Sequence, residues 1–129
     1  MEPENLLAAN NLAYTLCTSD PKNNTVLTES FAVIRPAAAK APQVAAFQDT
    51  LGWVEILAGQ APEGTRRIAR ALPGLRLNPA VHYHLGVGYS KTGQPELARL
   101  HLQNVQYLAK SQPIPEVAMA SEAIKSLGR

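Results

Sequence analysis

The chain has 129 residues, of which 46% are hydrophobic and 17% are charged, so its composition is that of a folded protein and excludes intrinsic disorder. The length suits one domain. Twelve Lys and Arg residues against ten Asp and Glu give a net charge of +2, which is too small to predict a nucleic-acid partner.

Nothing in the sequence predicts a membrane segment or a secretory signal. Glu2, Glu4 and several asparagines stand where a signal peptide needs basic and then apolar residues. No apolar run approaches the roughly 18 residues of a membrane-spanning helix, so we expect no direct membrane insertion. The compartment stays unknown: the chain as written suits the cytoplasm, whereas a fragment of a longer secreted protein would belong to the periplasm or cell envelope.

A first helix hairpin is predicted at about residues 5–42. Residues 18–24, Thr-Ser-Asp-Pro-Lys-Asn-Asn, have the composition of a turn and separate its two helices. Pro36 falls inside the second helix. Because proline lacks an amide hydrogen and clashes with the preceding turn, it is expected to kink that helix or to shift its start.

Two further hairpins are predicted at about residues 43–77 and 79–110. Each begins with a helix whose apolar residues recur at spacings of three and four, turns at Gly59 or Gly93, and returns as a second helix. The Pro-Gly pair at 73–74 is expected to weaken or end the returning helix of the second hairpin. The expected inward-facing residues are Val44, Phe47, Leu51, Val54, Leu57, Ile68, Ala69, Ala71 and Leu72, then Val81, Leu85, Gly88, Tyr89, Leu97, Ala98, Val105 and Leu108.

The two later hairpins are also copies of one another. A shift of 34 residues places Leu51-Gly52 on Leu85-Gly86 and Gly59-Gln60 on Gly93-Gln94. After them a last helix is predicted at about residues 113–127, preceded by Pro113. Its apolar stripe is Val117, Ala120, Ile124 and Leu127.

These residues resemble the tetratricopeptide repeat, a helix hairpin of 34 residues with a Leu-Gly pair and a bulky residue in its first helix and a turn glycine before its second. The matching residues are Leu85, Gly86, Tyr89, Gly93, Ala98 and Leu102 in the third hairpin, Leu51, Gly52, Gly59, Gly64, Ile68 and Ala71 in the second, and more loosely Leu12, Ala13, Ile34, Ala37 and Pro42 in the first. Glu55 departs from the pattern, because it stands where the third hairpin has Tyr89. The resemblance covers about residues 5–127. It implies an all-α, right-handed solenoid of about three hairpins with a C-terminal capping helix, in a single domain over residues 1–129.

In such arrays the first helices of the hairpins line a concave groove that binds a segment of a protein partner. The resemblance places in this groove Asn10, Tyr14, Cys17, Asp49, Trp53, Ile56, Tyr83, Val87, Ser90 and Lys91. Aromatic residues in this set would suit interface anchors. We therefore expect a non-catalytic protein-protein interaction module. The other interpretation, which is equally open, is that Trp53 and Tyr14 only fill space between hairpins.

Two roles of other classes stay open. The phrases NNLAYTL and DTLGWV are similar to C-terminal repeats of large bacterial tetratricopeptide proteins, including ones associated with exopolysaccharide export. The alternative role is therefore a structural or self-associating segment of a longer envelope protein, and homo-oligomers are left open. An enzyme would need Cys17 and a distant histidine as nucleophile and base, and no local motif supports that pairing.

No metal and no cofactor are expected. His82 and His84 point about 200° apart on a helix, so they cannot share an ion, and we expect both to be partly exposed beside the Leu85 stripe, with His101 distant in sequence. A cluster of basic residues has two interpretations, a strip for an acidic partner or simply a solvated face. It comprises Arg66, Arg67, Arg70 and Arg76.

Overall fold

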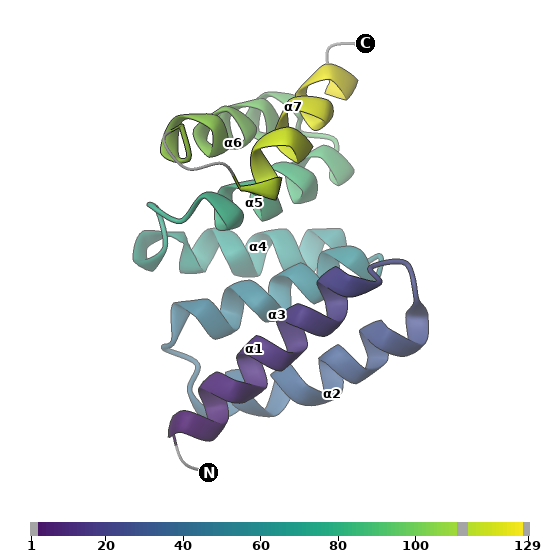
Figure 1. Ribbon diagram of the computed structural model, residues 1–129, viewed down its shortest axis with the longest axis vertical. Coiled ribbons are helices and arrows are strands. Elements are labelled where there is room, and N and C mark those ends of the chain that lie inside the picture. Colours follow the sequence, from purple (N-terminus) through teal and green to yellow (C-terminus); the bar gives the residue numbers. More distant parts are fainter. Residues whose placement is uncertain (1–2, 111–113, 128–129) are drawn as a thin grey trace. The chain divides into compact units, whose positions relative to one another are not determined.

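The computed structural model describes residues 3–110 and 114–127, which form α-helices and one short 3₁₀ helix and no strand (Figure 1). The helices are α1 (Pro3–Ser19), α2 (Asn24–Lys40), α3 (Ala45–Leu57), α4 (Ala61–Ala71), the 3₁₀ helix η1 (Leu72–Gly74), α5 (Pro79–Lys91), α6 (Pro95–Leu108) and α7 (Pro115–Leu127). The all-α fold predicted from the sequence is confirmed. None of the helices in the described ranges is long and apolar enough to cross a membrane.

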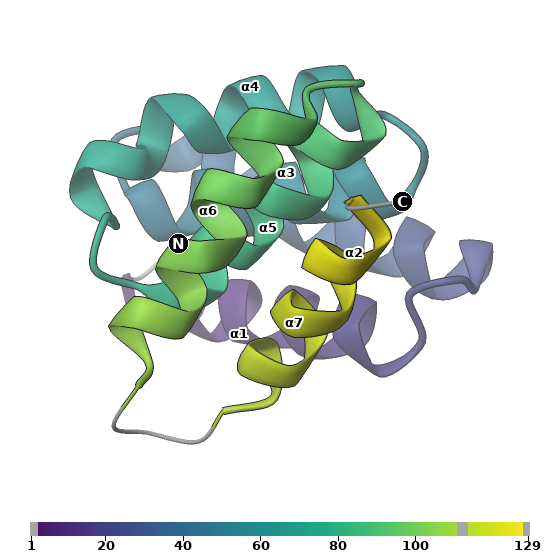
Figure 2. The ribbon, with the colours of Figure 1, turned by 90° about the horizontal axis from the view of Figure 1, so that it is seen from above.

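The helices pair as three hairpins, α1 with α2, α3 with α4 and α5 with α6. The chain forms two compact units, Met1–Ala71 with α1 to α4 and Leu72–Arg129 with η1 and α5 to α7. In the first unit α3 also packs on α1 and α2, and in the second α7 packs on α5 and α6 (Figure 2). The single domain over residues 1–129 stays a prediction.

The turns follow from a few residues. Gly59 and Gly93 have φ angles of 93° and 77°, and no atom lies within 4 Å of where a Cβ would stand, so the backbone angle and not the space favours glycine. Asn23 caps α2 by accepting hydrogen bonds from the amides of Thr25 and Val26. Asn78 caps α5 in the same way.

Proline acts differently at three places. Helix α2 begins at Asn24 and continues through Pro36, so the proline does not set the start of the helix, which the Asn23 cap fixes. At 73–74 the expected break is confirmed, because α4 ends at Ala71 and η1 follows. Helix α7 begins at Pro115, and Pro113 lies outside the described residues.

The core of the first unit depends on close approach of its helices. A Cβ on Gly52 would lie 2.5 Å from Cγ1 of Ile68, and Gly64 faces the backbone of Gly52 in return. In the α1–α2 hairpin, the buried Ser30 hydroxyl donates a hydrogen bond of 2.9 Å to the carbonyl oxygen of Ala13. Small residues at these positions therefore let neighbouring helices touch along their backbones.

The second unit has a core between α5, α6 and α7. Its buried residues Leu102, Val105 and Ala120 pack with partly buried side chains, which are Tyr83, Ala123, Ile124 and Leu127. Gly86 of α5 lies against the side chain of Leu102. One expectation is wrong here: Leu97, predicted to face inward from α6, is 40% exposed.

Candidate partner-binding site

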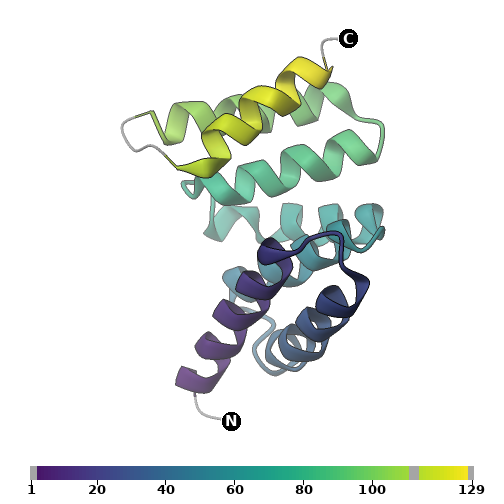
Figure 3. The same cartoon turned by 45° about the vertical axis from the view of Figure 1, so that its right-hand side comes forward.

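The expected groove residues of the first unit belong to α1 and α3, which pack on one another (Figure 3). Three of them, Asp49, Trp53 and Ile56, are buried. Ile56 lies against Gly64 of α4, so it supports the α3–α4 contact. Asn10 and Tyr14 on α1 are half-buried. These two side chains are thus the part of the predicted set that this unit leaves accessible.

Asn10 has a further property. Its amide oxygen is buried and has no hydrogen-bond partner within residues 3–110 and 114–127. Buried acceptors are nearly always satisfied in folded proteins, and leaving one without a donor costs about 1 to 3 kcal/mol. The side chain therefore keeps an unused capacity for a hydrogen bond.

The expected groove residues of the second unit all lie on α5. Tyr83 packs against the buried cluster of α6 and α7, and burial together with the charge of Glu116 raises its pKa above the ordinary value. Val87 is half-buried, and Ser90 and Lys91 are exposed. Ser90 and Lys91 lie three and four residues after Val87, so all three share one side of α5 and remain accessible.

Cys17, also expected in the groove, is buried on α1. Burial, and to a smaller extent the nearby charge of Asp49, raise the pKa of its thiol to about 12. Its Sγ donates a hydrogen bond of 3.4 Å to the carbonyl oxygen of Tyr14. A thiol in this state is neutral at physiological pH, so it lacks the thiolate that nucleophilic catalysis requires.

The histidines are arranged differently from the sequence-based expectation. His82 and His84 are both buried instead of partly exposed. His82 is covered because α6 packs on α5 and brings His101 to it. The Nδ1 atoms of His82 and His101 lie 3.0 Å apart, and Nε2 of His82 lies 2.7 Å from the carbonyl oxygen of Arg76. Their 19-residue separation on two facing helices hid this pair from a search for local motifs.

When both rings carry one hydrogen each, the two contacts fix where those hydrogens lie. A carbonyl oxygen only accepts, so His82 donates its Nε2 hydrogen to Arg76 and keeps a lone pair on Nδ1. His101 then donates its own Nδ1 hydrogen to that lone pair. Tyr89 stacks on the His101 ring with centroids 5.6 Å apart. In the part of the chain that the structure describes, no three His, Cys, Asp or Glu side chains gather as metal ligands.

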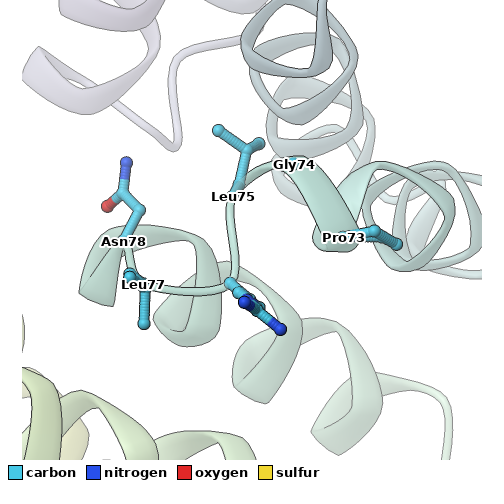
Figure 4. A pocket seen from close by; sticks show the side chains of 6 residues that line it. Pro73, Gly74, Leu75, Leu77 and Asn78 are labelled. Atoms are coloured by element: carbon cyan, nitrogen blue, oxygen red, sulfur yellow. The ribbon is translucent and has the colours of Figure 1, made fainter.

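Residues 73–78 surround an open hollow of about 400 Å³, between η1 and α5 (Figure 4). The segment curves around it, and the bond from His82 to Arg76 holds the segment in place. The lining consists of Pro73, Gly74, Leu75, Arg76, Leu77 and Asn78. None of these side chains can serve as a catalytic acid, base or nucleophile, because Arg76 stays protonated and the others do not titrate.

The predicted basic strip is divided. Arg67 pairs with the buried Glu55 through Nε at 2.7 Å and Nη2 at 3.3 Å, and it also donates to Gln48 at 3.1 Å. Arg66, Arg70 and Arg76 are exposed. The pair also explains why Glu55 departs from the repeat pattern: at this position the chain needs a carboxylate to hold α4 against α3.

Comparison with known proteins identifies the fold. No family model matches the chain, and no curated protein matches it. Among solved structures, the Yersinia enterocolitica type III secretion translocator chaperone SycD matches with a TM-score of 0.78 and 15% identity, over 99% of this chain and 86% of that one. SycD in complex with a peptide of the translocator YopD matches with a TM-score of 0.75 and 16% identity, over 98% and 95% of the chains.

A third structure, a CopN–Scc3 complex, matches with a TM-score of 0.65 and 19% identity, over 98% of this chain and 69% of that one. At such identities the likeness is one of fold. The SycD-type chaperones have a helical fold like that of tetratricopeptide repeats, in line with the resemblance seen in the sequence.

Proposed function

We propose that the chain is a non-catalytic binding module that holds an extended segment of a partner protein, in the manner of a chaperone. One observation carries the proposal: almost the whole chain shares its fold with SycD, a chaperone whose structure contains a bound peptide of its translocator. The neutral thiol of Cys17 supports a non-catalytic role. The solved structures named above give no support to the alternative of an envelope-export segment.

The proposed contacts are the accessible residues of the predicted set. On α1, the half-buried Asn10 offers the exposed part of its side chain for contact and the half-buried Tyr14 ring offers a rigid apolar surface. On α5, Val87 offers apolar contact, Ser90 a hydroxyl and Lys91 a positive charge. The α1 residues would suit a peptide segment with apolar anchors, and the α5 residues would suit a segment that has an apolar anchor and a carboxylate. The buried residues Asp49, Trp53 and Ile56, together with Tyr83, would support these contacts from beneath.

A displayed library of random peptides, selected on the immobilised chain, tests this function. We expect enriched peptides to bind at least about tenfold more weakly to an Asn10→Ala, Tyr14→Ala variant and to a Val87→Asp, Lys91→Glu variant, which is about 1.4 kcal/mol of binding free energy. Helical circular dichroism must be unchanged in both variants. The matched control is Tyr107→Ala, which removes an exposed tyrosine from α6 and should leave peptide binding intact.

Two results would count against this role. One is a selection that enriches no peptide above an unrelated helical protein. The other is enrichment of peptides that bind all variants equally, because the α1 and α5 residues would then not be the contacts.

A further inference from the structure

Helix α6 is apolar on two opposite sides. Ala98, Leu102 and Val105 face inward and are fully buried. On its other side, Leu100 is 51% exposed and Tyr107 is 68% exposed. A helix packs in a single unit through one apolar stripe, and within residues 72–110 and 114–127 Leu100 and Tyr107 stay outside the buried core.

The exposed side has a regular pattern, which we name the outer stripe. Its residues are Glu96, Leu100, Gln103, Tyr107 and Lys110, all of them exposed. The spacings of four and three residues are those of a helix that packs along another helix. Lys110 lies just past the end of α6, where its Nζ stands 4.6 Å from the centroid of the Tyr107 ring.

The order of residues along the outer stripe makes it complementary to a second copy of the same stripe that runs in the opposite direction. An acid stands at one end and a base at the other, with Leu100 and Tyr107 at intermediate positions and Gln103 at the centre. In an antiparallel pair of such helices, Glu96 meets Lys110 of the second copy and Leu100 meets its Tyr107. A glutamine amide both donates and accepts, so Gln103 can pair with its own counterpart.

We propose that the outer stripe is a self-association surface, on which a second copy of this chain packs its own α6 in antiparallel orientation about a two-fold axis at Gln103. A two-fold interface must use the same patch on both copies, and the reversed order of charges meets this requirement. A parallel pair would instead place Glu96 against Glu96 and Lys110 against Lys110.

The small size of the outer stripe predicts a weak dimer. Fourteen residues of α6 make a helix about 21 Å long, and one such face buries less than a standard stable interface. We therefore expect a reversible dimer with a dissociation constant on the order of 10 to 100 µM. This association does not depend on the peptide-binding role proposed above.

Sedimentation equilibrium tests the association. The average mass should rise from 13.9 kDa toward twice that value as the concentration increases from about 5 µM to about 1 mM. Two leucines with the same exposure give a matched pair of variants, because Leu100 and Leu12 are each 51% exposed. Leu100→Glu should weaken the dimer at least about tenfold, whereas Leu12→Glu on α1 should change it less than about twofold.

Charge reversal tests the orientation. In the antiparallel dimer Glu96→Lys and Lys110→Glu each create two like-charge contacts, so each variant alone should self-associate more weakly. Carrying both changes in one chain should restore the dimer, and so should an equimolar mixture of the two single variants. A parallel dimer would not lose affinity in either single variant.

Several outcomes would overturn the proposal. The first is a monomer at every concentration up to about 1 mM. The second is a dimer that persists in Leu100→Glu, or one that Leu12→Glu weakens as much. The third is a double charge reversal that stays as weak as the single variants. Circular dichroism confirms that each variant is folded before its mass is interpreted.

Discussion

Gly64 of α4 rests directly on the backbone carbonyl of Gly52 in α3. A Cβ on Gly64 would overlap that oxygen, and a Cβ on Gly52 would lie 2.8 Å from the carbonyl oxygen of Gly64. The contact is therefore backbone against backbone, and neither partner can rotate away. At Gly86, by contrast, an added Cβ would meet the side chain of Leu102, which can adjust.

This difference predicts unequal effects of the same substitution. Gly64→Ala should lower the free energy of unfolding by about 1 to 3 kcal/mol, because overpacking outweighs the gain in helix propensity. Gly86→Ala should cost less, since the closest atoms to the added Cβ belong to the side chain of Leu102 and not to the backbone. Urea unfolding measures both values. An equal or smaller loss in Gly64→Ala would show that α3 and α4 separate more easily than the contact implies.

The bidentate pair of Glu55 and Arg67 predicts that two adjacent arginines differ in importance. Arg67→Ala should destabilise the chain by about 1 to 3 kcal/mol, because it leaves the buried Glu55 carboxylate without its cation. Arg66→Ala, which removes an exposed side chain next to it, should change stability by less than about 0.5 kcal/mol. Thermal or urea unfolding of the two variants makes the comparison. Similar losses in both would contradict a specific role for the ion pair.

The histidine pair predicts a loss of stability in acid. Burial, and secondly the neighbouring His82, lower the pKa of His101 from 6.5 to about 4. As the pH falls below 6.5, the unfolded chain takes up this proton before the folded chain does. The contribution of the neutral His101 to the free energy of unfolding is therefore complete above pH 6.5 and disappears progressively toward pH 4. By pH 5 this one group should account for about 2 kcal/mol.

Urea unfolding at pH 7.5 and pH 5 measures the acid effect. His101→Phe keeps an aromatic ring against Tyr89 but removes the titrating group. The loss of stability between the two pH values should be smaller in this variant by about 2 kcal/mol. Because His82 and the Arg76 segment surround the same site, the absolute stability will also change, so the comparison uses the pH difference alone. An unchanged difference would contradict the assignment to His101.

The raised pKa of Cys17 predicts an unreactive thiol. Its reaction with a disulfide reagent at pH 8 should be slow in the folded chain, because almost no thiolate exists when the pKa is about 12. The same reaction should become fast in about 8 M urea, where the pKa returns to roughly 8.5. Fast labelling of the folded chain would remove this support for a non-catalytic role.

Local signals in the sequence predicted much of the fold. Gly59 and Gly93 mark turns because their positive φ angles suit glycine, and the 34-residue shift that relates their hairpins requires no knowledge of tertiary contacts. The turn at residues 18–24 was also predictable from local sequence, because the Asn23 side chain caps the helix that follows it. Such features depend on residues close together in sequence.

The site was less predictable, because burial depends on distant parts of the chain. The resemblance to the repeat family placed Asp49, Trp53 and Ile56 in the predicted groove, but all three are buried in the folded chain. The same limit applies to His82, whose partner lies on another helix, and to Glu55, whose role becomes clear only beside Arg67. A periodic pattern predicts which residues share one side of a helix, but it does not predict which other helix packs on that side.

The bond from His82 to Arg76 also bears on proteolysis. Trypsin cleaves after arginine, and at Arg76 it would have to bind the same carbonyl oxygen that already accepts a hydrogen from His82. The adjoining Leu77 is 74% exposed, so access alone does not protect this peptide bond. We therefore expect trypsin to cut the Arg76–Leu77 bond more slowly than the exposure of the segment alone would allow, because cutting requires this hydrogen bond to open.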